Sequence, residues 1–362
     1  MLNFTLAELA KRFNLILIGE PDHCISGVAS LDSADAHQLS FFNSGKYRLQ
    51  LLGTRAGAVL MKAPERTLGQ HQSNFQELDR VNALISANPH ADFARIAALF
   101  APLKQIFPGV HASAVVELGA SIHASAEIGA QCFIASSAVI AANVKLGAQC
   151  IVGPDCVVGA YSELMARVTL VKRVRLGRCV IVHSGAVIGA DGFSFAQDQG
   201  HWLKVPQLGR VIIGDGCDIG ANTTIDCGAL DDTVLGVEVK LDNQIQIGHN
   251  VRIGDFTAIA GCTAVAGSTA IGARCLIAGG VGIAGHLEIC DGVSVMAMSL
   301  VSAPITEKGI YAGAMPLMSQ REWRKNAVHL RQLDGTLRKM KQIDKADSHL
   351  GSKSLPENKD ND

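Results

Sequence analysis

An aliphatic residue recurs at every sixth position through more than half of this 362-residue chain. The series begins at Val110, runs unbroken to Ile188, resumes at Ile213 and, after a shift of four residues before Leu235, continues to Val301. A period of six fits neither an α-helix nor a β-hairpin. It fits short parallel strands joined by tight corners, each strand sending one branched side chain inward. The repeat therefore predicts a parallel β-helix.

Small residues usually occupy the position two before each aliphatic residue, and five of the ten cysteines fall there. These are Cys132, Cys150, Cys156, Cys217 and Cys275. Free cysteine behaves as a small buried apolar residue. The chain has no CxxC pair with metal-ligand spacing and no secretory signal, so we expect reduced thiols inside the coil and no metal site.

Two interruptions break the repeat, at residues 189–210 and 227–236. A coil cannot absorb extra residues within a strand, so both segments are expected to leave it as loops at corners. The longer one carries Phe193, Phe195 and Trp202. Aromatic and glycine-rich loops of this length are usually functional or form interfaces.

The rest of the chain divides by its pattern. Residues 1–107 lack the repeat and are expected to form a small α/β domain, with helices at 5–13, 74–85 and 91–103 and a strand at 56–62. The β-helix is expected over 108–314 and a C-terminal helix over 315–345. Residues 346–362 are polar and expected to be disordered.

Bulk charge and hydropathy exclude several partners. The formal net charge is -1, which gives no global attraction to nucleic acid or an anionic membrane. No apolar run reaches the ~18 residues of a membrane span. We therefore expect a cytoplasmic protein with no transmembrane segment and no nucleic-acid partner.

One histidine stands out in the repeat. Residues 18 apart should lie one coil above one another, about 4.8 Å apart, so His249 faces Gly267 and, one coil further, Gly285. His286 should share this corner, and Asp242 could orient the His249 ring. A neutral imidazole beside a free backbone N–H suits acyl transfer by a general base with an oxyanion donor. The alternative is an ordinary corner, because glycine is common at tight corners.

The segment "SFFNSGKYR" in the N-terminal domain offers a second candidate site. Two aromatics, Phe41 and Tyr47, flank a turn that also carries Asn43, Ser44 and Lys46. Such a pair can hold a planar base, with the lysine meeting a phosphate. The alternative is that these are core aromatics of a small domain.

Several motifs, taken in order, resemble one family. They are "SFFNSGKYR", "GADGFSFA", "PQLGRVIIGDGCDIGANTTID", "GALDDT", "DNQIQIGHNVRIGD", "GHLEICDG" and "PITEKGIYAGAMP". The chain resembles the UDP-3-O-(3-hydroxyacyl)glucosamine N-acyltransferases of the lipid A pathway. The resemblance implies a left-handed β-helix, a homotrimer, and transfer of a 3-hydroxyacyl chain from acyl carrier protein to the 2-amino group of UDP-3-O-(3-hydroxyacyl)glucosamine. It implies no cofactor beyond the phosphopantetheine thioester of the donor.

The same resemblance assigns roles to individual residues. His249 corresponds to the catalytic base, Asp242 to its partner and Gly267 to the oxyanion donor. Further substrate contacts are expected from His286, Asn243, Gln246 and Lys46. They are also expected from Asn43 and Ser44, although Ser44 stands where the family usually has asparagine and Asn43 lies one position early. Phe41 and Tyr47 match the pair that stacks on uracil.

Two other functions fit parts of the pattern. A UDP-N-acetylglucosamine O-acyltransferase would share the β-helix and a catalytic histidine, but its relatives lack a domain corresponding to residues 1–107. A non-catalytic hexapeptide-repeat protein would keep the coil and bind only a ligand or partner. Retention of His249, His286, Phe41 and Tyr47 weighs against it.

Overall fold

The computed structural model describes residues 2–63, 81–102 and 105–350, with side chains described as far as residue 344. The chain divides into two compact units, Met1–Gln105 and Ile106–Asp362.

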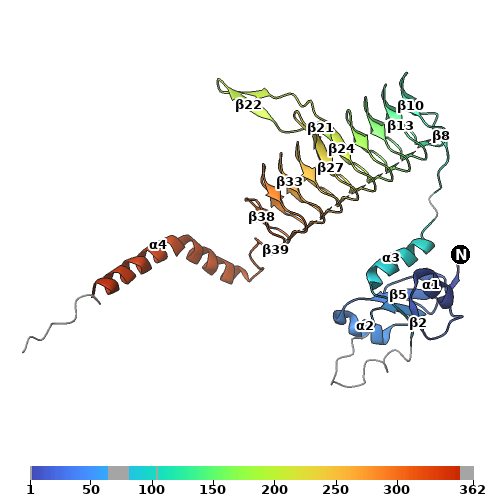
Figure 1. The fold of residues 1–362 in the computed structure, drawn as a ribbon, viewed down its shortest axis with the longest axis horizontal. Helices are drawn as coiled ribbons and strands as arrows, with labels where there is room; N and C mark the ends of the chain where they lie inside the picture. Colours follow the sequence, from blue (N-terminus) through green and yellow to red (C-terminus); the bar gives the residue numbers. More distant parts are fainter. Residues whose placement is uncertain (1, 64–80, 103–104, 351–362) are drawn as a thin grey trace, which may run out of the picture. The chain divides into compact units, whose positions relative to one another are not determined.

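Three parallel sheets form most of the second unit (Figure 1). In the described part of the chain they contain nine, eleven and ten strands. Sheet I consists of β10 (Ser121–Ile122), β13 (Val139–Ile140), β16 (Val157–Val158), β19 (Arg175–Leu176), β24 (Val211–Ile213), β27 (Thr233–Leu235), β30 (Arg252–Ile253), β33 (Ala270–Ile271) and β36 (Glu288–Ile289). Sheet II consists of β8 (Gly109–Val110), β11 (Glu127–Ile128), β14 (Lys145–Leu146), β17 (Glu163–Leu164), β20 (Ile181–Val182), β25 (Asp218–Ile219), β28 (Lys240–Leu241), β31 (Ala258–Ile259), β34 (Leu276–Ile277), β37 (Ser294–Val295) and β39 (Ile310–Tyr311). Sheet III consists of β9 (Val115–Val116), β12 (Phe133–Ile134), β15 (Ile151–Val152), β18 (Thr169–Leu170), β21 (Val187–Asp191), β26 (Thr224–Cys227), β29 (Gln246–Ile247), β32 (Ala264–Val265), β35 (Gly282–Ile283) and β38 (Leu300–Val301).

The six-residue repeat accounts for this architecture. Successive strands of the coil belong to different sheets, and each strand pairs with the equivalent strand of the next coil, as Ile128 does with Leu146. The aliphatic residue of nearly every strand is buried in one continuous core, which contains the five predicted cysteines as well. Burying each of these branched side chains contributes about 1.5–3 kcal/mol. The predicted fold class, a parallel β-helix with an N-terminal α/β domain and a C-terminal helix, is confirmed.

Both interruptions leave the coil, but over fewer residues than predicted. Residues 189–191 still belong to β21, Cys227 ends β26, and Thr233–Leu235 forms β27 of the coil. In the longer one, β22 (Phe195–Asp198) and β23 (His201–Lys204) form an antiparallel hairpin beyond β21 (Figure 1). The shorter one lengthens its coil by four residues, and Ile225 becomes the strand partner of Ile247 as a result. This shift decides which side chains lie beside β29.

The first unit contains a five-stranded sheet in the order β2-β7-β6-β5-β4. Its elements are β1 (Phe4–Thr5), α1 (Leu6–Phe13), β2 (Ile16–Ile18), β3 (Cys24–Ile25), β4 (Gly27–Val28), β5 (Gln38–Phe42), η1 (Gly45–Tyr47), α2 (Arg48–Gly53), β6 (Ala58–Met61), β7 (Asn82–Ile85) and α3 (Pro89–Phe100). Thr5 and Glu8 form a capping box at the start of α1. The predicted helices near residues 5–13 and 91–103 and the predicted strand at 56–62 are confirmed.

One predicted helix, residues 74–85, is wrong at its C-terminal end. Asn82–Ile85 forms strand β7, between β2 and β6, and Leu84 is fully buried there. A short apolar run in the middle of a sheet overrides local helical spacing. Residues 74–80 lie outside the described part of the chain.

The C-terminal helix α4 spans Gln320–Leu350 rather than 315–345. Ser319 and Glu322 form a capping box, which explains its later start. The helix continues through 346–350, where a disordered tail was expected, and residues 351–362 lie outside the described part. No helix in the described residues is long and apolar enough to cross a membrane.

Candidate functional site

A groove of about 810 Å³ runs along sheet III and contains His249, which follows β29. We call it the His249 groove. One wall comes from the base of the hairpin and the other from the coil. Its lining consists of Asp191, Gly192, Phe193, Phe195, Lys204, Asp226, Gln246, Gly248, His249, Ala264, Val265, Ala266, Gly267, Gly282, Ile283, Ala284 and Leu300. Mostly apolar walls with a few polar groups are typical of a small-molecule site of this size.

The predicted pair of His249 and Gly267 is brought together. A methyl group on Gly267 would lie 2.6 Å from His249 Nε2 and 2.7 Å from Cε1, so the ring lies directly against the glycine. Gly192, from the hairpin wall, covers the other end of the side chain, and a methyl group there would lie 2.6 Å from His249 Cβ. The imidazole is therefore held between two glycines on different elements.

Asn250 fixes the tautomer of His249. Asn250 Oδ1 lies 3.0 Å from His249 Nδ1 and also accepts a hydrogen bond from the Ala229 N–H, while Nδ2 donates to the Asp231 carbonyl. The two backbone partners set the orientation of the amide, so its oxygen faces the ring and Nδ1 must be the donor. Nε2 then carries the lone pair, on the side of the ring that meets Gly267.

The backbone around Gly267 leaves its N–H available. The ladder across this corner uses the amides of Gly248, Ala266 and Ser268, which donate to Val265, Ile283 and His249. Among the described residues, no hydrogen bond is donated by the Gly267 amide. A basic nitrogen and a free donor thus lie side by side in the groove, as general-base acyl transfer requires.

Asp242 does not occupy the position predicted for it. Its Oδ2 accepts a hydrogen bond from the Gly261 amide at 2.9 Å, and it lines a separate depression of about 650 Å³ on sheet II. A residue seven positions before His249 belongs to the previous strand, and successive strands lie on different faces of the coil. Within one chain, Asn250 rather than Asp242 lies against His249 Nδ1, and the role of Asp242 stays a prediction.

The other substrate contacts predicted in the β-helix lie at different distances from His249. Asn243 accepts a hydrogen bond from the Ala221 amide at 2.6 Å, at the corner after sheet II. Gln246, on sheet III, does line the His249 groove and hydrogen-bonds Thr224 and Asp226. His286 meets Gly267 through its backbone N–H, which donates to the Gly267 carbonyl at 3.1 Å, while its side chain is exposed.

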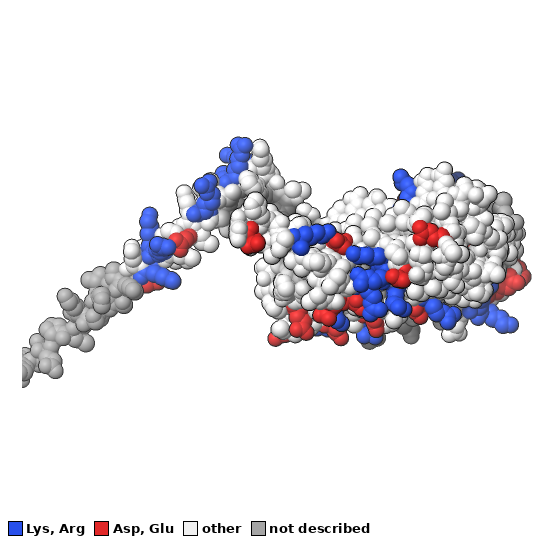
Figure 2. All heavy atoms as spheres, turned by 90° about the horizontal axis from the view of Figure 1, so that it is seen from above, with Lys and Arg blue, Asp and Glu red and all other residues white. Residues whose placement is uncertain are grey.

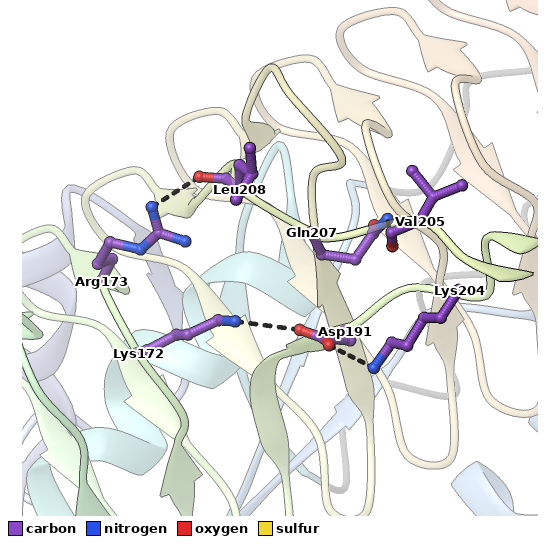
Figure 3. A network of polar contacts seen from close by, with 7 residues as sticks. All are labelled: Lys172, Arg173, Asp191, Lys204, Val205, Gln207 and Leu208. Carbon is purple, nitrogen blue, oxygen red and sulfur yellow. Dashed lines mark hydrogen bonds and ion pairs between the residues drawn. The ribbon is translucent and has the colours of Figure 1, made fainter.

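An ion-pair network ties the hairpin to the coil (Figure 3). Lys172, after β18, and Lys204, on β23, reach Asp191 from opposite sides, at 3.1 and 2.6 Å. The two ammonium groups, Lys204 first, lower the pKa of Asp191. Arg173 adds a hydrogen bond to the Leu208 carbonyl at 2.7 Å. These contacts hold the hairpin wall of the groove beside His249.

In the N-terminal unit, Phe41 and Tyr47 have different surroundings. Phe41, on β5, packs against Phe93 with ring centroids 4.5 Å apart and stacks on His90 at 5.8 Å. Tyr47 is 40% exposed, with the Lys46 ammonium 4.7 Å from the centre of its ring. Asn43 is exposed and Ser44 half-buried in the connection between β5 and η1. A base held between Phe41 and Tyr47 stays a prediction.

Comparison with known proteins gives the family. Residues 22–99 match the family model of UDP-3-O-(3-hydroxymyristoyl) glucosamine N-acyltransferase, LpxD, and residues 119–160 match that of the bacterial transferase hexapeptide, six repeats. The UDP-3-O-acylglucosamine N-acyltransferase of Xanthomonas axonopodis pv. citri is 50% identical over 95% of this chain and 99% of its own length. This chain belongs to the UDP-3-O-acylglucosamine N-acyltransferase family.

Other relatives span the same length. The UDP-3-O-acylglucosamine N-acyltransferase of Pseudomonas fluorescens is 47% identical over 94% of both chains. Among solved structures, an LpxA from Acinetobacter baumannii aligns at 23% identity over 57% of this chain and 71% of its own, with a TM-score of 0.46. Membership in the N-acyltransferase family decides against the O-acyltransferase alternative.

Sequence reasoning missed two residues near His249 in this family member: Asn250, which contacts its ring, and Asp226, which lines the groove. Asn250 follows His249 directly, and its left-handed backbone (φ 61°) marks it as a corner residue, a conformation that asparagine tolerates. Asp226 precedes Gly248 by one coil plus the four extra residues of the shorter interruption. Counting those four residues would have identified Asp226 as the neighbour of Gly248 in the preceding coil.

Proposed function

We propose that this protein transfers a 3-hydroxyacyl chain from acyl carrier protein to the 2-amino group of UDP-3-O-(3-hydroxyacyl)glucosamine, a step of lipid A biosynthesis in the cytoplasm. The observation that carries the proposal is the His249 ring, with Nδ1 bound to Asn250 and Nε2 left as a base against Gly267. Family membership supports the same acceptor.

The groove residues suit direct transfer. The amine attacks the thioester carbonyl as His249 Nε2 takes its proton, and the resulting oxyanion accepts a hydrogen bond from the Gly267 N–H. Collapse of this intermediate forms the amide and breaks the carbon–sulfur bond. The imidazolium then returns its proton to the thiolate, so protons balance and no covalent enzyme intermediate is needed. The groove's apolar lining, with small side chains at Ala264 and Gly282, suits the acyl chain.

The positive charge of helix α4 supports an acidic protein as the carrier of the acyl donor. Between residues 321 and 345 the sequence contains eight Lys or Arg and three acidic residues, and Figure 2 shows Lys and Arg side chains along the helix. A helix with this excess of positive charge attracts an acidic partner. We assign this role to acyl carrier protein.

Exposed apolar surface supports a homotrimer. Leu276, Met296 and Ile310, at 58, 51 and 78% exposure, surround the depression on sheet II. Helix α4 also exposes Trp323, Leu330, Leu333, Leu337 and Met340. Apolar surface of this extent marks contacts with other chains, and packing of three β-helices would cover the sheet II surface.

In the N-terminal unit, Phe41 and Tyr47 are assigned to the uracil of the acceptor.

The deciding test is transfer by the purified protein from 3-hydroxyacyl-acyl carrier protein to UDP-3-O-acylglucosamine, followed by mass spectrometry of the product. We expect one added acyl group on nitrogen. A control reaction with UDP-N-acetylglucosamine, which has no free amine, should give no product. Ligand binding without turnover would instead support the non-catalytic alternative.

Asn250→Ala is expected to lower kcat about tenfold or more, because His249 loses the acceptor that sets its tautomer. The control is Asn143→Ala, because Asn143 is also a corner residue with a left-handed backbone (φ 55°). Placing alanine in that conformation costs a similar conformational free energy in both variants. Steady-state kinetics with both substrates saturating, together with thermal midpoints, separates the two effects. An equal loss of kcat in both variants would contradict the role of Asn250.

A further inference from the structure

Asp226 is the one carboxylate of the His249 groove that the proposed chemistry leaves without a role or a bound cation. It lies in β26, a central strand of sheet III, where the preceding Ile225 pairs with Ile247. This register puts Asp226 beside Gly248, the residue before His249. Both Asp226 and His249 line the groove.

The surroundings of Asp226 differ from those of the other groove acid. Asp191 is bound by Lys172 and Lys204. Asp226 is half-buried, and its hydrogen bond within the described residues comes from a neutral donor, Gln246 Nε2, at 3.0 Å. Burial raises the pKa of Asp226 to about 6, while the charge of a protonated His249 acts in the opposite direction. At pH 8 the groove thus contains one carboxylate without a permanent counter-ion.

His249 needs such an anion during the reaction. Its hydrogen-bond partner, Asn250, orients the ring but is neutral, and the ring becomes a cation when it takes the proton of the acceptor amine. A cation in a partly desolvated groove is unfavourable unless an opposite charge is close. The remaining charged groups that line the groove, Asp191 and Lys204, are paired with each other.

We propose that Asp226 is the electrostatic partner of His249, a positioning residue whose carboxylate stabilises the imidazolium formed during acyl transfer. The inference rests on the proposed role of His249 as the base. It adds a residue that makes no hydrogen bond to the ring in this structure and acts through the field of its charge.

The test is Asp226→Asn, which keeps the shape and an acceptor for Gln246 but removes the charge. We expect kcat at pH 8 to fall about tenfold or more, with little change in KM. The acidic limb of the kcat/KM profile should move to lower pH by about half a unit or more, because the carboxylate favours the protonated ring and only the neutral ring is a base. Asp226→Glu should keep the limb near its wild-type position.

Two measurements distinguish this from a structural role. The thermal midpoint of Asp226→Asn at pH 8 should equal or exceed that of the wild type, because the variant removes a half-buried charge. Glu288→Gln, at an exposed carboxylate on sheet I, is the control and should change neither kcat nor the limb. If Asp226→Asn does not fold, the test is Asp226→Glu. An acidic limb of its kcat/KM profile near the wild-type position supports the inference, and a limb moved to lower pH contradicts it.

The outcomes separate the two proposals. If His249→Ala is inactive while Asp226→Asn keeps kcat and its acidic limb, this inference fails and the function stands. If His249→Ala keeps wild-type turnover, the base assignment itself fails.

Discussion

Replacing His249 by alanine is expected to reduce acyl transfer about 10³-fold or more while leaving the fold and assembly unchanged. The variant removes the only ring in the described part of the groove that offers a lone pair next to a free amide, so the attacking amine keeps its proton. The loss should appear in kcat, measured with saturating acyl carrier protein thioester and acceptor. Circular dichroism and size-exclusion chromatography report whether the fold and assembly persist.

A second histidine provides a matched control for this variant. His123 also follows an aliphatic residue of the repeat at a corner, but its Nδ1 hydrogen-bonds Ser125 Oγ at 2.9 Å and its side chain is exposed. His123→Ala should therefore keep near-wild-type kcat. Turnover of His249→Ala close to that of His123→Ala would contradict the assignment of the base.

The six-residue repeat determined most of what could be predicted. A buried aliphatic at each sixth position fixes the strand spacing, the inward face and the neighbour of each residue in the next coil. The buried cysteines and the contact between His249 and Gly267 follow from it. These predictions succeeded because one local rule, repeated along the coil, carries the long-range contacts.

The repeat does not determine contacts that depend on side-chain geometry. Asp242 is close to His249 in the sequence, but the corner between them turns the chain onto another sheet. Asn250 gains its role from the backbone of the 227–236 loop, through Ala229 and Asp231, which no periodicity describes. Asp226 depends on the same loop, because its four extra residues reset the partner of each strand.

Strand β7 shows a different limit. Ala83, Leu84 and Ile85 follow a segment with helical spacing, and nothing in the adjoining sequence distinguishes a buried strand from a helix end. The strand forms because it fills the position between β2 and β6. Tertiary pairing decides the structure there, and a single sequence does not contain that information locally.

Gly267→Ala tests the groove by steric means alone. The backbone of Gly267 does not need a positive φ, so alanine can adopt it, but the new methyl group would lie 2.6 Å from His249 Nε2 and 3.0 Å from Cδ2. The ring has to move away from the position set by Asn250. A displacement of about 1 Å costs roughly 10² in rate, so we expect kcat to fall about 10²-fold while the free energy of unfolding changes by no more than about 1–3 kcal/mol.

Gly279→Ala is the control for this effect, because Gly279 occupies the same place in its hexapeptide, two residues after the buried Ile277. A methyl group there would lie 3.2 Å from the Gly261 carbonyl oxygen, a longer contact than the 2.6 Å to His249 Nε2 at Gly267. Both variants add a methyl group to a corner, but only one of them meets the imidazole. A loss of kcat confined to Gly267→Ala would attribute the effect to the position of the base, because the cost of a corner methyl group to the coil is common to both. Equal kcat in the two variants would show that the ring can reach its working position without the space beside Gly267, and the steric prediction for this residue would be wrong.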